Sequence, residues 1–421
     1  MRILWVSANG GNYKSYKVKG TGGWTGALQE ALCSALPDLE LGITFFHSTD
    51  DDNIEENGVT YMPVSYDYGK TEVQKLLIRH FRNEDKYRSN RLRAMVEKIR
   101  IYKPDVIHIW GIEHFHAGVL EYINDIPIVV HIQGLLSACM YTYMPPSLSL
   151  ETLKHSDTWI SRNLLKNGFW FYYELNKKRA ENEIHCSKFI KNWIGRTDWD
   201  YAMSQMLSPG SRYFHCEELM RSDFDGYKWH YHYDGEVINI HSSISGEWYK
   251  GIDIVLKTAQ LLKNLNVNIC WNVYGCSRRS KLVLTYAKLF NINPDDVNVY
   301  LHGQVDGETI KQGLLLCDCY VHPSYIENSS NAIAEAQMLG VPVIAQYVGG
   351  NASMLRDGSG ILVAPNEPYI LASAIMKMRD KSIAEDLSVK AFNIGQHRQN
   401  KEKTIKDLVS IYQQLLYAEE K

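Results

Sequence analysis

Short apolar runs alternate with amphipathic segments along most of the chain, and this alternation constrains the fold more than any other feature. The first run, residues 3–7, is followed by a glycine-rich loop and a helical pattern over 24–36. Strands that alternate with helices are typical of parallel sheets, because parallel strands need a long crossover connection. We therefore predict an α/β fold built on parallel sheets.

The alternation occurs as two series separated by a stretch without a clear period, 227–236. Strands are expected first at 3–7, 42–47, 59–63, 105–110 and 127–132, with helical patterns such as 73–101, and then at 237–242, 268–274, 297–301, 319–322, 341–345 and 361–363, with helices at 251–263, 281–290 and 308–316. A chain of 421 residues is too long for one core. We predict two domains, 1–233 and 234–400, and a C-terminal helix within 401–421.

Composition disfavours several classes of protein. A net charge of −3 gives no general attraction to nucleic acid, so no nucleic-acid partner is expected. No apolar run is long enough for a membrane span. The opening apolar run is followed by glycines and lysines, which favours a first strand over a signal peptide and predicts a cytoplasmic protein. Cys317 and Cys319 form the one close cysteine pair, and we expect buried thiols there in preference to zinc ligands.

The stretch from His322 to Gly340 is where we expect the chemistry. A strand ends at His322, and Asn328, Ser329 and Ser330 have the pattern of a helix N-cap that leaves backbone N–H groups free. Such groups suit a phosphate. Glu327 precedes this anion site, and Glu335 lies about 9 Å further along the helix at about 1.5 Å per residue. One carboxylate is expected to meet a sugar and the other a ribose.

Two further candidates of the second series flank this stretch. Lys250 precedes a predicted helix, and its ammonium would neutralise a diphosphate leaving group if it faced the other helix start across one crevice. It is otherwise a solvated first-turn lysine. Gly303 and Val305 follow a predicted strand in a loop that would frame a base.

Polar residues also follow the strands of the first series. Gly22 and Gly23 open a helix after the first strand, an arrangement that suits a phosphate, although a plain tight turn explains the same residues. His108 and His131 end two strands, and the carboxyl ends of parallel strands line a ligand crevice. His131 would orient a sugar hydroxyl or shuttle a proton. Both histidines have the alternative of a hydrogen-bonded structural role.

Two later segments bear on an acceptor. Residues 162–179 mix aromatic and basic side chains, which predicts either contact with a lipid surface or lipid-linked acceptor, or an amphipathic helix packed on the sheet. Arg196 ends the next apolar run, where it would hold an acceptor phosphate or carboxylate, or form an ion pair with Asp198 or Asp200.

An ordered set of motifs runs through the second series. After Lys250 come Glu327, Glu335-Ala, Gly-Val-Pro-Val-Ile at 340–344, Val-Gly-Gly at 348–350 and Asp-Gly-Ser-Gly-Ile-Leu-Val at 357–363. The set resembles the donor half of the family 4 retaining glycosyltransferases of the GT-B type. The first series resembles that family only in outline, and Gly-Arg-Thr-Asp-Trp-Asp at 195–200 is similar to a variant among polysaccharide-assembly transferases.

The resemblance implies two Rossmann-like domains that face each other across a cleft, with the C-terminal helix crossing back to the first domain. The nucleotide sugar would bind mainly to the second domain. Glu335 would take the ribose and Glu327 would lie by the sugar. Lys250 and the backbone N–H groups of Ser329, Ser330 and Asn331 would hold the diphosphate, and no divalent metal or other cofactor is implied.

One position departs from the family pattern. Its members commonly carry an arginine five residues before the lysine, where this chain has Ser245. Either another cation, such as Arg278, Arg279 or Arg196, supplies the missing charge, or the diphosphate is held less strongly.

The reaction implied is transfer of a glycosyl group with retained anomeric configuration. The acceptor would be a glycan or a lipid-linked molecule, in capsule or other cell-surface polysaccharide synthesis, with peripheral contact at the inner face of the membrane. Three alternatives remain open: a GT-B nucleotide-sugar epimerase, a non-catalytic nucleotide-sugar-binding protein and, least favoured, a Rossmann oxidoreductase, because no dinucleotide fingerprint follows either first strand.

Overall fold

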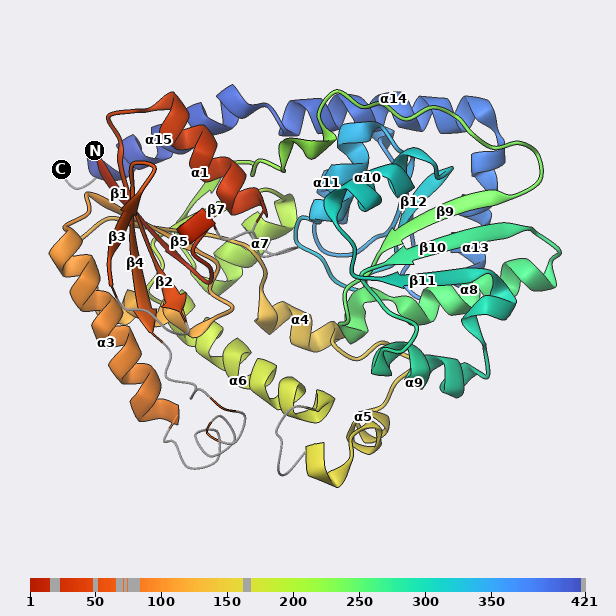
Figure 1. Cartoon of the computed structure of the whole chain (residues 1–421), viewed down its shortest axis with the longest axis horizontal. Coiled ribbons are helices and arrows are strands. Elements are labelled where there is room, and N and C mark those ends of the chain that lie inside the picture. The colour runs from red at the N-terminus through yellow and green to blue at the C-terminus, as the bar shows by residue number, and fades with distance from the viewer. Residues whose placement is uncertain are drawn as a thin grey trace.

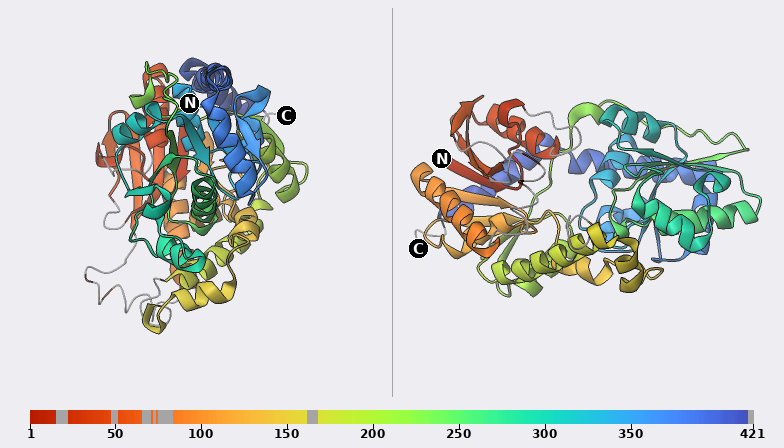
Figure 2. Two further views of the ribbon diagram at one scale, coloured as in Figure 1. Left: turned by 90° about the vertical axis from the view of Figure 1, so that its right-hand side faces the viewer. Right: turned by 60° about the horizontal axis from the view of Figure 1, so that its bottom comes forward.

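The computed structural model describes residues 1–15, 23–47, 52–65, 71, 74, 84–161 and 168–417. Two α/β units lie side by side, each with a sheet between helices (Figures 1 and 2). This arrangement confirms the predicted GT-B architecture.

The first sheet has eight strands in the described residues. In spatial order they are β3 (Ile54–Glu56), β4 (Val59–Ser65), β2 (Glu40–His47), β1 (Arg2–Ser7), β5 (Val106–Trp110), β6 (Ile128–His131), β7 (Asn192–Gly195) and β8 (Arg212–His215). The described pairings are parallel apart from that of β3 with β4.

The second sheet has six strands in the described residues, all paired in parallel. In spatial order they are β11 (Val299–Gly303), β10 (Ile269–Tyr274), β9 (Ile238–Ser243), β12 (Cys319–His322), β13 (Val343–Gln346) and β14 (Ile361–Val363). The strand order reverses at β9 and β12, which pair although they are far apart in the sequence. A ligand crevice is expected at such a switch point.

Helices cover both faces of each sheet (Figure 1). Those from the first half of the chain are α1 (Gly23–Ala35), α3 (Glu84–Tyr102), α4 (Leu136–Thr142), α5 (Leu150–Ser156), which packs against the core of the second unit, α6 (Phe169–Ser187) and α7 (Asp198–Leu207). Those of the second are α8 (Ile252–Asn264), α9 (Lys281–Phe290), α10 (Gly307–Leu315), α11 (Asn331–Leu339), α12 (Asn351–Met354), α13 (Pro368–Met376) and α14 (Lys381–Arg398), and α15 (Lys401–Tyr417) ends the described chain.

Every predicted strand overlaps an observed one. The sequence did not reveal β3 and β8, two short strands at the edges of the first sheet, because they alternate weakly and are only partly buried. The helix predicted over 73–101 is observed from Glu84, and most of the residues before it lie outside the described part of the chain. The helix predicted within 162–179 is α6, which begins at Phe169.

The C-terminal helix α15 packs on the first sheet, as the resemblance implied. Its buried residues recur at helical spacing, which gives an apolar stripe that needs a partner: Ile405, Leu408, Ile411, Tyr412 and Leu415. The Tyr412 hydroxyl lies 3.2 Å from Nε1 of Trp5 and 2.7 Å from Nδ1 of His108. The end of the chain is therefore fixed to β1 and β5.

The two units do not correspond to two continuous halves of the sequence. Tyr143 and Leu153 of the first half are buried in the core of the second unit. In the segment that joins the sheets, the Trp229 indole is buried in the same core and donates to the Cys317 carbonyl at 2.7 Å. The predicted division after residue 233 stays a prediction.

Candidate active site

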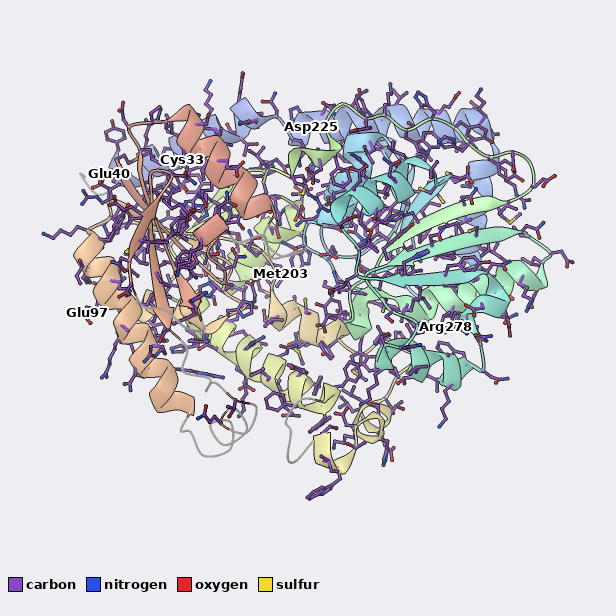
Figure 3. All side chains as sticks on the ribbon, in the orientation of Figure 1. Cys33, Glu40, Glu97, Met203, Asp225 and Arg278 are labelled. Carbon is purple, nitrogen blue, oxygen red and sulfur yellow. The ribbon has the colours of Figure 1, made fainter. Side chains whose placement is uncertain are left out.

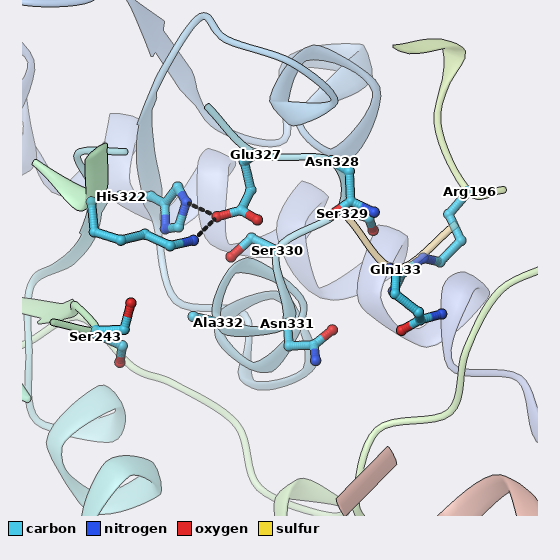
Figure 4. A pocket seen from close by; sticks show the side chains of 12 residues that line it. Gln133, Arg196, Ser243, His322, Glu327, Asn328, Ser329, Ser330, Asn331 and Ala332 are labelled. Carbon is cyan, nitrogen blue, oxygen red and sulfur yellow. Dashed lines mark hydrogen bonds and ion pairs between the residues drawn. The ribbon is translucent and has the colours of Figure 1, made fainter. Parts of the chain in front are cut away.

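A cavity of about 350 Å³ lies between the two sheets, at the carboxyl ends of their strands. Its lining comes mostly from the second unit: Ser243, Ser245, Lys250, His322, Glu327, Asn328, Ser329, Ser330, Asn331 and Ala332. Gln133 and Arg196, which follow β6 and β7, line it from the first unit (Figure 4). The structure thus brings most of the predicted donor residues and one acceptor-side candidate into one crevice.

A carboxylate with two partners dominates one wall. Oε2 of Glu327 lies 2.6 Å from Nζ of Lys250 and 3.2 Å from Nε2 of His322 (Figure 4). Burial alone would raise the pKa of Glu327, but the charge of Lys250 and the contact with His322 outweigh it and lower the pKa to about 2. Glu327 is therefore an anion at neutral pH.

His322 is a cavity residue that the sequence marked only as the end of a strand. Its Nδ1 lies 3.0 Å from the Tyr320 hydroxyl. Burial lowers the pKa of His322, although Glu327 raises it in part, so the ring is neutral. With the Tyr320 hydroxyl donating to Nδ1, Nε2 carries the proton and donates to Glu327.

Lys250 reaches Glu327 because its loop is pressed against the turn after β12. Gly251 has a φ of +83°, and a Cβ there would lie 2.0 Å from the Pro323 carbonyl oxygen. The N–H of Tyr325 also donates to the Tyr249 carbonyl at 2.8 Å. The glycine after the lysine is thus required by this close approach.

The start of α11 supplies free backbone donors. Ser330 is the N-cap, and its hydroxyl accepts from the N–H of Ile333. In the described chain the N–H groups of Ser329, Asn331 and Ala332 have no hydrogen-bond partner. The Ser330 N–H, which we expected to be free, lies 3.1 Å from Sδ of Met354. The free donors at this helix start therefore include the Ala332 N–H, which the sequence did not suggest.

Two glycines hold the loop before α11 in place. A Cβ on Gly349 would lie 1.8 Å from the Glu327 carbonyl oxygen, and one on Gly350 would lie 1.7 Å from that of Asn328. The Gly350 N–H donates to the Glu327 carbonyl at 2.9 Å. The Val-Gly-Gly motif thus positions the Glu327 backbone by direct contact.

The residues predicted for the nucleoside lie beyond the cavity lining. Glu335 is one turn into α11 and pairs with Arg221 at 2.8 Å. Gly303 ends β11, where its carbonyl accepts from the Gly275 N–H at 2.7 Å, and Val305 follows it. Gly22 lies outside the described residues, whereas Gly23 begins α1.

On the opposite wall Arg196 is held by a buried carboxylate. Its Nη1 lies 2.7 Å from Oε2 of Glu218, and the Gln133 amide donates to the other oxygen. The alternative left open by the sequence, an ion pair with Asp198 or Asp200, is wrong, because the partner is Glu218. Oδ2 of Asp200 instead accepts from the backbone N–H groups of Arg196 and the next residue, where it caps α7.

The two predicted histidines are buried behind this wall. His131 is 1% exposed, and its Nε2 lies 3.6 Å from Oε1 of Glu218. The Trp110 ring stacks on both, with a distance between ring centres of 4.7 Å to His131 and 4.0 Å to His108. Burial lowers the pKa of both histidines, that of His108 to about 3. Neither lines the cavity.

Of the cations proposed to replace the family arginine, only Arg196 lines the cavity. Arg278 pairs with Asp295 on an exposed loop of the second unit (Figure 3), and Arg279 is exposed. A cation that the sequence did not suggest is Arg398, at the end of α14. Its Nη2 lies 3.1 Å from Oγ of Ser329 and 2.8 Å from Oε2 of Glu217.

Nothing in the described part of the chain forms a group of three or more His, Cys, Asp or Glu residues placed to hold a metal ion. Cys317 and Cys319 are buried free thiols. No described helix is long and apolar enough to cross a membrane.

Comparison with known proteins points to one family over the second unit. Residues 236–381 match the family model described as glycosyl transferases group 1. This part of the chain resembles a group 1 glycosyltransferase domain. The match contains Lys250, Glu327 and Glu335, and it confirms the resemblance to the family 4 transferases.

Relatives of this group 1 domain match it over short stretches. A putative teichuronic acid biosynthesis glycosyltransferase of Bacillus subtilis, TuaC, is 36% identical over 81 residues, which is 19% of this chain and 21% of TuaC. The chain thus aligns with about a fifth of that relative's length.

Solved structures match the whole fold at low identity. Sucrose-phosphate synthase of Thermosynechococcus elongatus superposes with a TM-score of 0.70 at 17% identity, over 99% of this chain and 100% of that one. Anabaena HepE, in complex with UDP and glucose, superposes with a TM-score of 0.60 at 16% identity, over 98% and 99%. Both similarities concern the fold alone.

Proposed function

We propose that the protein is a retaining glycosyltransferase that moves a sugar from a nucleotide-diphosphate sugar to a glycan or lipid-linked acceptor. The observation that carries this proposal is the Lys250–Glu327 pair beside the free N-terminus of α11, in a crevice that the first unit closes with Arg196. A cation and unpaired backbone donors on one wall suit a diphosphate. The facing wall leaves room for a second substrate.

In this proposal the donor lies along α11. Lys250 and the N–H groups of Ser329, Asn331 and Ala332 bind the diphosphate. Glu327 lies by the sugar and Glu335 by the ribose. The loop of Gly303 and Val305 frames the base, and the strand-to-helix turn with Gly22 and Gly23 approaches the donor from the first unit.

The proposed transfer needs no metal or other cofactor to account for its bonds and its proton. The bond between the anomeric carbon and the diphosphate oxygen breaks, and the acceptor oxygen forms its bond on the same face. The acceptor proton passes to the departing diphosphate, whose negative charge Lys250 stabilises. Glu327, with a pKa of about 2, is a weak base, so its contribution is electrostatic stabilisation of an oxocarbenium-like sugar.

The first unit is assigned the acceptor. Arg196 and Gln133 face the cavity and are fixed by Glu218, so they are preorganised donors for acceptor oxygens. His131 and His108 are buried, so we assign them to the support of this wall. His131 would act through Glu218 and not by contact with substrate.

The name of one relative guides the biological setting. Because TuaC is named for teichuronic acid biosynthesis, we place the transfer in cell-surface polysaccharide synthesis, in the cytoplasm at the inner face of the membrane. HepE was solved with UDP, which makes a UDP-sugar the first donor to test.

The test begins with thermal-shift measurements against UDP, GDP, ADP and CMP sugars, since a ligand that binds only the native state raises stability. The donor that binds is then incubated with candidate glycan and lipid-linked acceptors, and the anomeric configuration of the product is read by NMR. Isomerisation of the donor without acceptor would establish an epimerase. Binding without turnover, unaltered in Glu327→Ala, would establish a non-catalytic binding protein.

A further inference from the structure

Arg221 lies in the segment that joins the two sheets. In space, its side chain contacts residues of both α10 and α11. Its Nη2 is 2.8 Å from Oε1 of Glu335, 114 residues further along the chain. In the proposed function Glu335 meets the ribose. Arg221 therefore lies at the nucleoside end of the donor site, outside the family motifs.

The guanidinium of Arg221 is held from two sides. Its Cζ lies 5.3 Å from the centre of the Phe224 ring, a cation–π distance. On the other side, a Cβ on Gly307, the first residue of α10, would lie 2.5 Å from Nη1. The Arg221 side chain is thus packed between its neighbours, and it fits there because Gly307 has no side chain.

The contact leaves half of the carboxylate available. Arg221 donates to Oε1 of Glu335, whereas Oε2 accepts no hydrogen bond from any described residue. The Glu335 side chain is 13% exposed, so it is largely removed from water but not sealed. A single-oxygen contact fixes the carboxylate and leaves the second oxygen for ribose hydroxyls.

We infer that Arg221 is a positioning residue of the nucleotide-sugar site, which holds Glu335 so that its free oxygen accepts hydrogen bonds from the ribose. This inference rests on the proposed function, because it takes Glu335 as the ribose ligand. The opposite possibility is that Arg221 competes with the ribose, and it predicts changes of opposite sign.

The charges around Glu335 provide a readout. Burial raises the pKa of Glu335, the guanidinium of Arg221 offsets part of that rise, and Asp223 adds to it. The Tyr320 hydroxyl is also coupled to Glu335: burial raises its pKa most, and the charges of Glu327 and Glu335 add to the rise. Without Arg221 the pKa of Glu335 rises further, so the carboxylate protonates as pH falls and becomes a poorer acceptor.

The experiment measures the Kd of UDP, GDP and ADP and of their 2′-deoxy counterparts by calorimetry from pH 8 to pH 6. We compare wild type with Arg221→Gln, Arg221→Lys and Glu335→Gln, and use Arg278→Gln as a matched control outside the cavity. Arg221→Gln should weaken the binding ribonucleotide about tenfold at pH 7, as expected for one charge-assisted hydrogen bond. The penalty should grow as pH falls and be smaller for the deoxynucleotide.

The variants separate the outcomes. Arg221→Lys should recover part of the affinity, and Glu335→Gln should reduce discrimination between ribose and deoxyribose at every pH. Binding in Arg221→Gln that matches or exceeds wild type, or a loss that is equal for both sugars and independent of pH, would overturn the inference while leaving the proposed function intact. If no nucleotide binds the wild type, the proposed function fails and the inference fails with it.

Discussion

Among the described residues, Lys250 is the one lysine or arginine that pairs with the buried carboxylate of Glu327. Replacing it with alanine removes that charge, and the structure indicates how much the loss should cost. The pKa of Glu327 is about 2 in the folded chain, against 4.5 for a free glutamate. A difference of about 2.5 pKa units corresponds to roughly 3 kcal/mol of stability. Because Lys250 is the largest stabilising influence, Lys250→Ala should lose most of this contribution at neutral pH.

The sign of the pH dependence follows from the direction of each shift. In the wild type the pKa of Glu327 is depressed, so its contribution is fully present above about pH 4.5 and is lost as pH falls toward 2. In Lys250→Ala burial dominates, although His322 still opposes it, so the pKa of Glu327 rises. Protonation in the folded state then begins at a higher pH, and the stability deficit of the variant should shrink as pH falls from 7 to 5.

Urea unfolding at pH 5, 6 and 7 tests this reasoning without any ligand. The control is the double variant Lys250→Ala/Glu327→Gln, which removes the uncompensated charge and should recover much of the lost free energy of unfolding. With an identified donor, Lys250→Ala should also lose about 1.5 to 3 kcal/mol of transition-state stabilisation in kcat/KM. Equal stability of wild type and Lys250→Ala at pH 7, with parallel pH profiles, would refute the account of the pair.

Three further variants test the scaffold and the facing wall. Gly350→Ala should lower Tm and nucleotide affinity together, because its Cβ would lie 1.7 Å from a carbonyl oxygen, whereas Gly134→Ala, which meets nothing within 4 Å, should change neither. Tyr412→Phe removes the hydroxyl beside His108 and should cost about 1 to 3 kcal/mol in urea unfolding, with nucleotide binding unchanged. Arg196→Ala should lower the free energy of unfolding by about 3 to 5 kcal/mol, because it leaves the buried carboxylate of Glu218 unpaired. It should also slow transfer more than it weakens donor binding. An equal loss of both would contradict the assignment of Arg196 to the acceptor side.

The strands, the helix start and the site residues that the sequence predicted are those determined by residues close to one another in the chain. Parallel strands buried on both faces read as continuous apolar runs, so β1, β5 and β12 were found within a residue or two. The N-cap at Ser330 was recognisable because capping depends on adjacent residues. The lysine and the two glutamates were found because their spacing belongs to a family motif.

The parts not predicted depend on contacts between distant residues. Glu218 binds Arg196 from 22 positions away, and Arg398 reaches Ser329 across 69. No period or motif marks such pairs, so the only ion-pair partners that the sequence suggested for Arg196 were its neighbours Asp198 and Asp200. The Ser330 amide was assumed to be free for a similar reason, since the sulfur that receives it belongs to another helix.

Three residues of the segment from Glu217 to Arg221 form ion pairs at different parts of the proposed site. Glu217 pairs with Arg398, which contacts Ser329 before α11. Glu218 pairs with Arg196 on the wall formed by the first unit, and Arg221 pairs with Glu335. These residues also lie between β8 of the first sheet and β9 of the second, so we expect a rotation of one unit against the other to act on these ion pairs. Since buried pairs are costly to break, the same contacts that position the side chains also fix the opening of the cleft. Ligand binding that alters one pair should therefore change the relative orientation of the units.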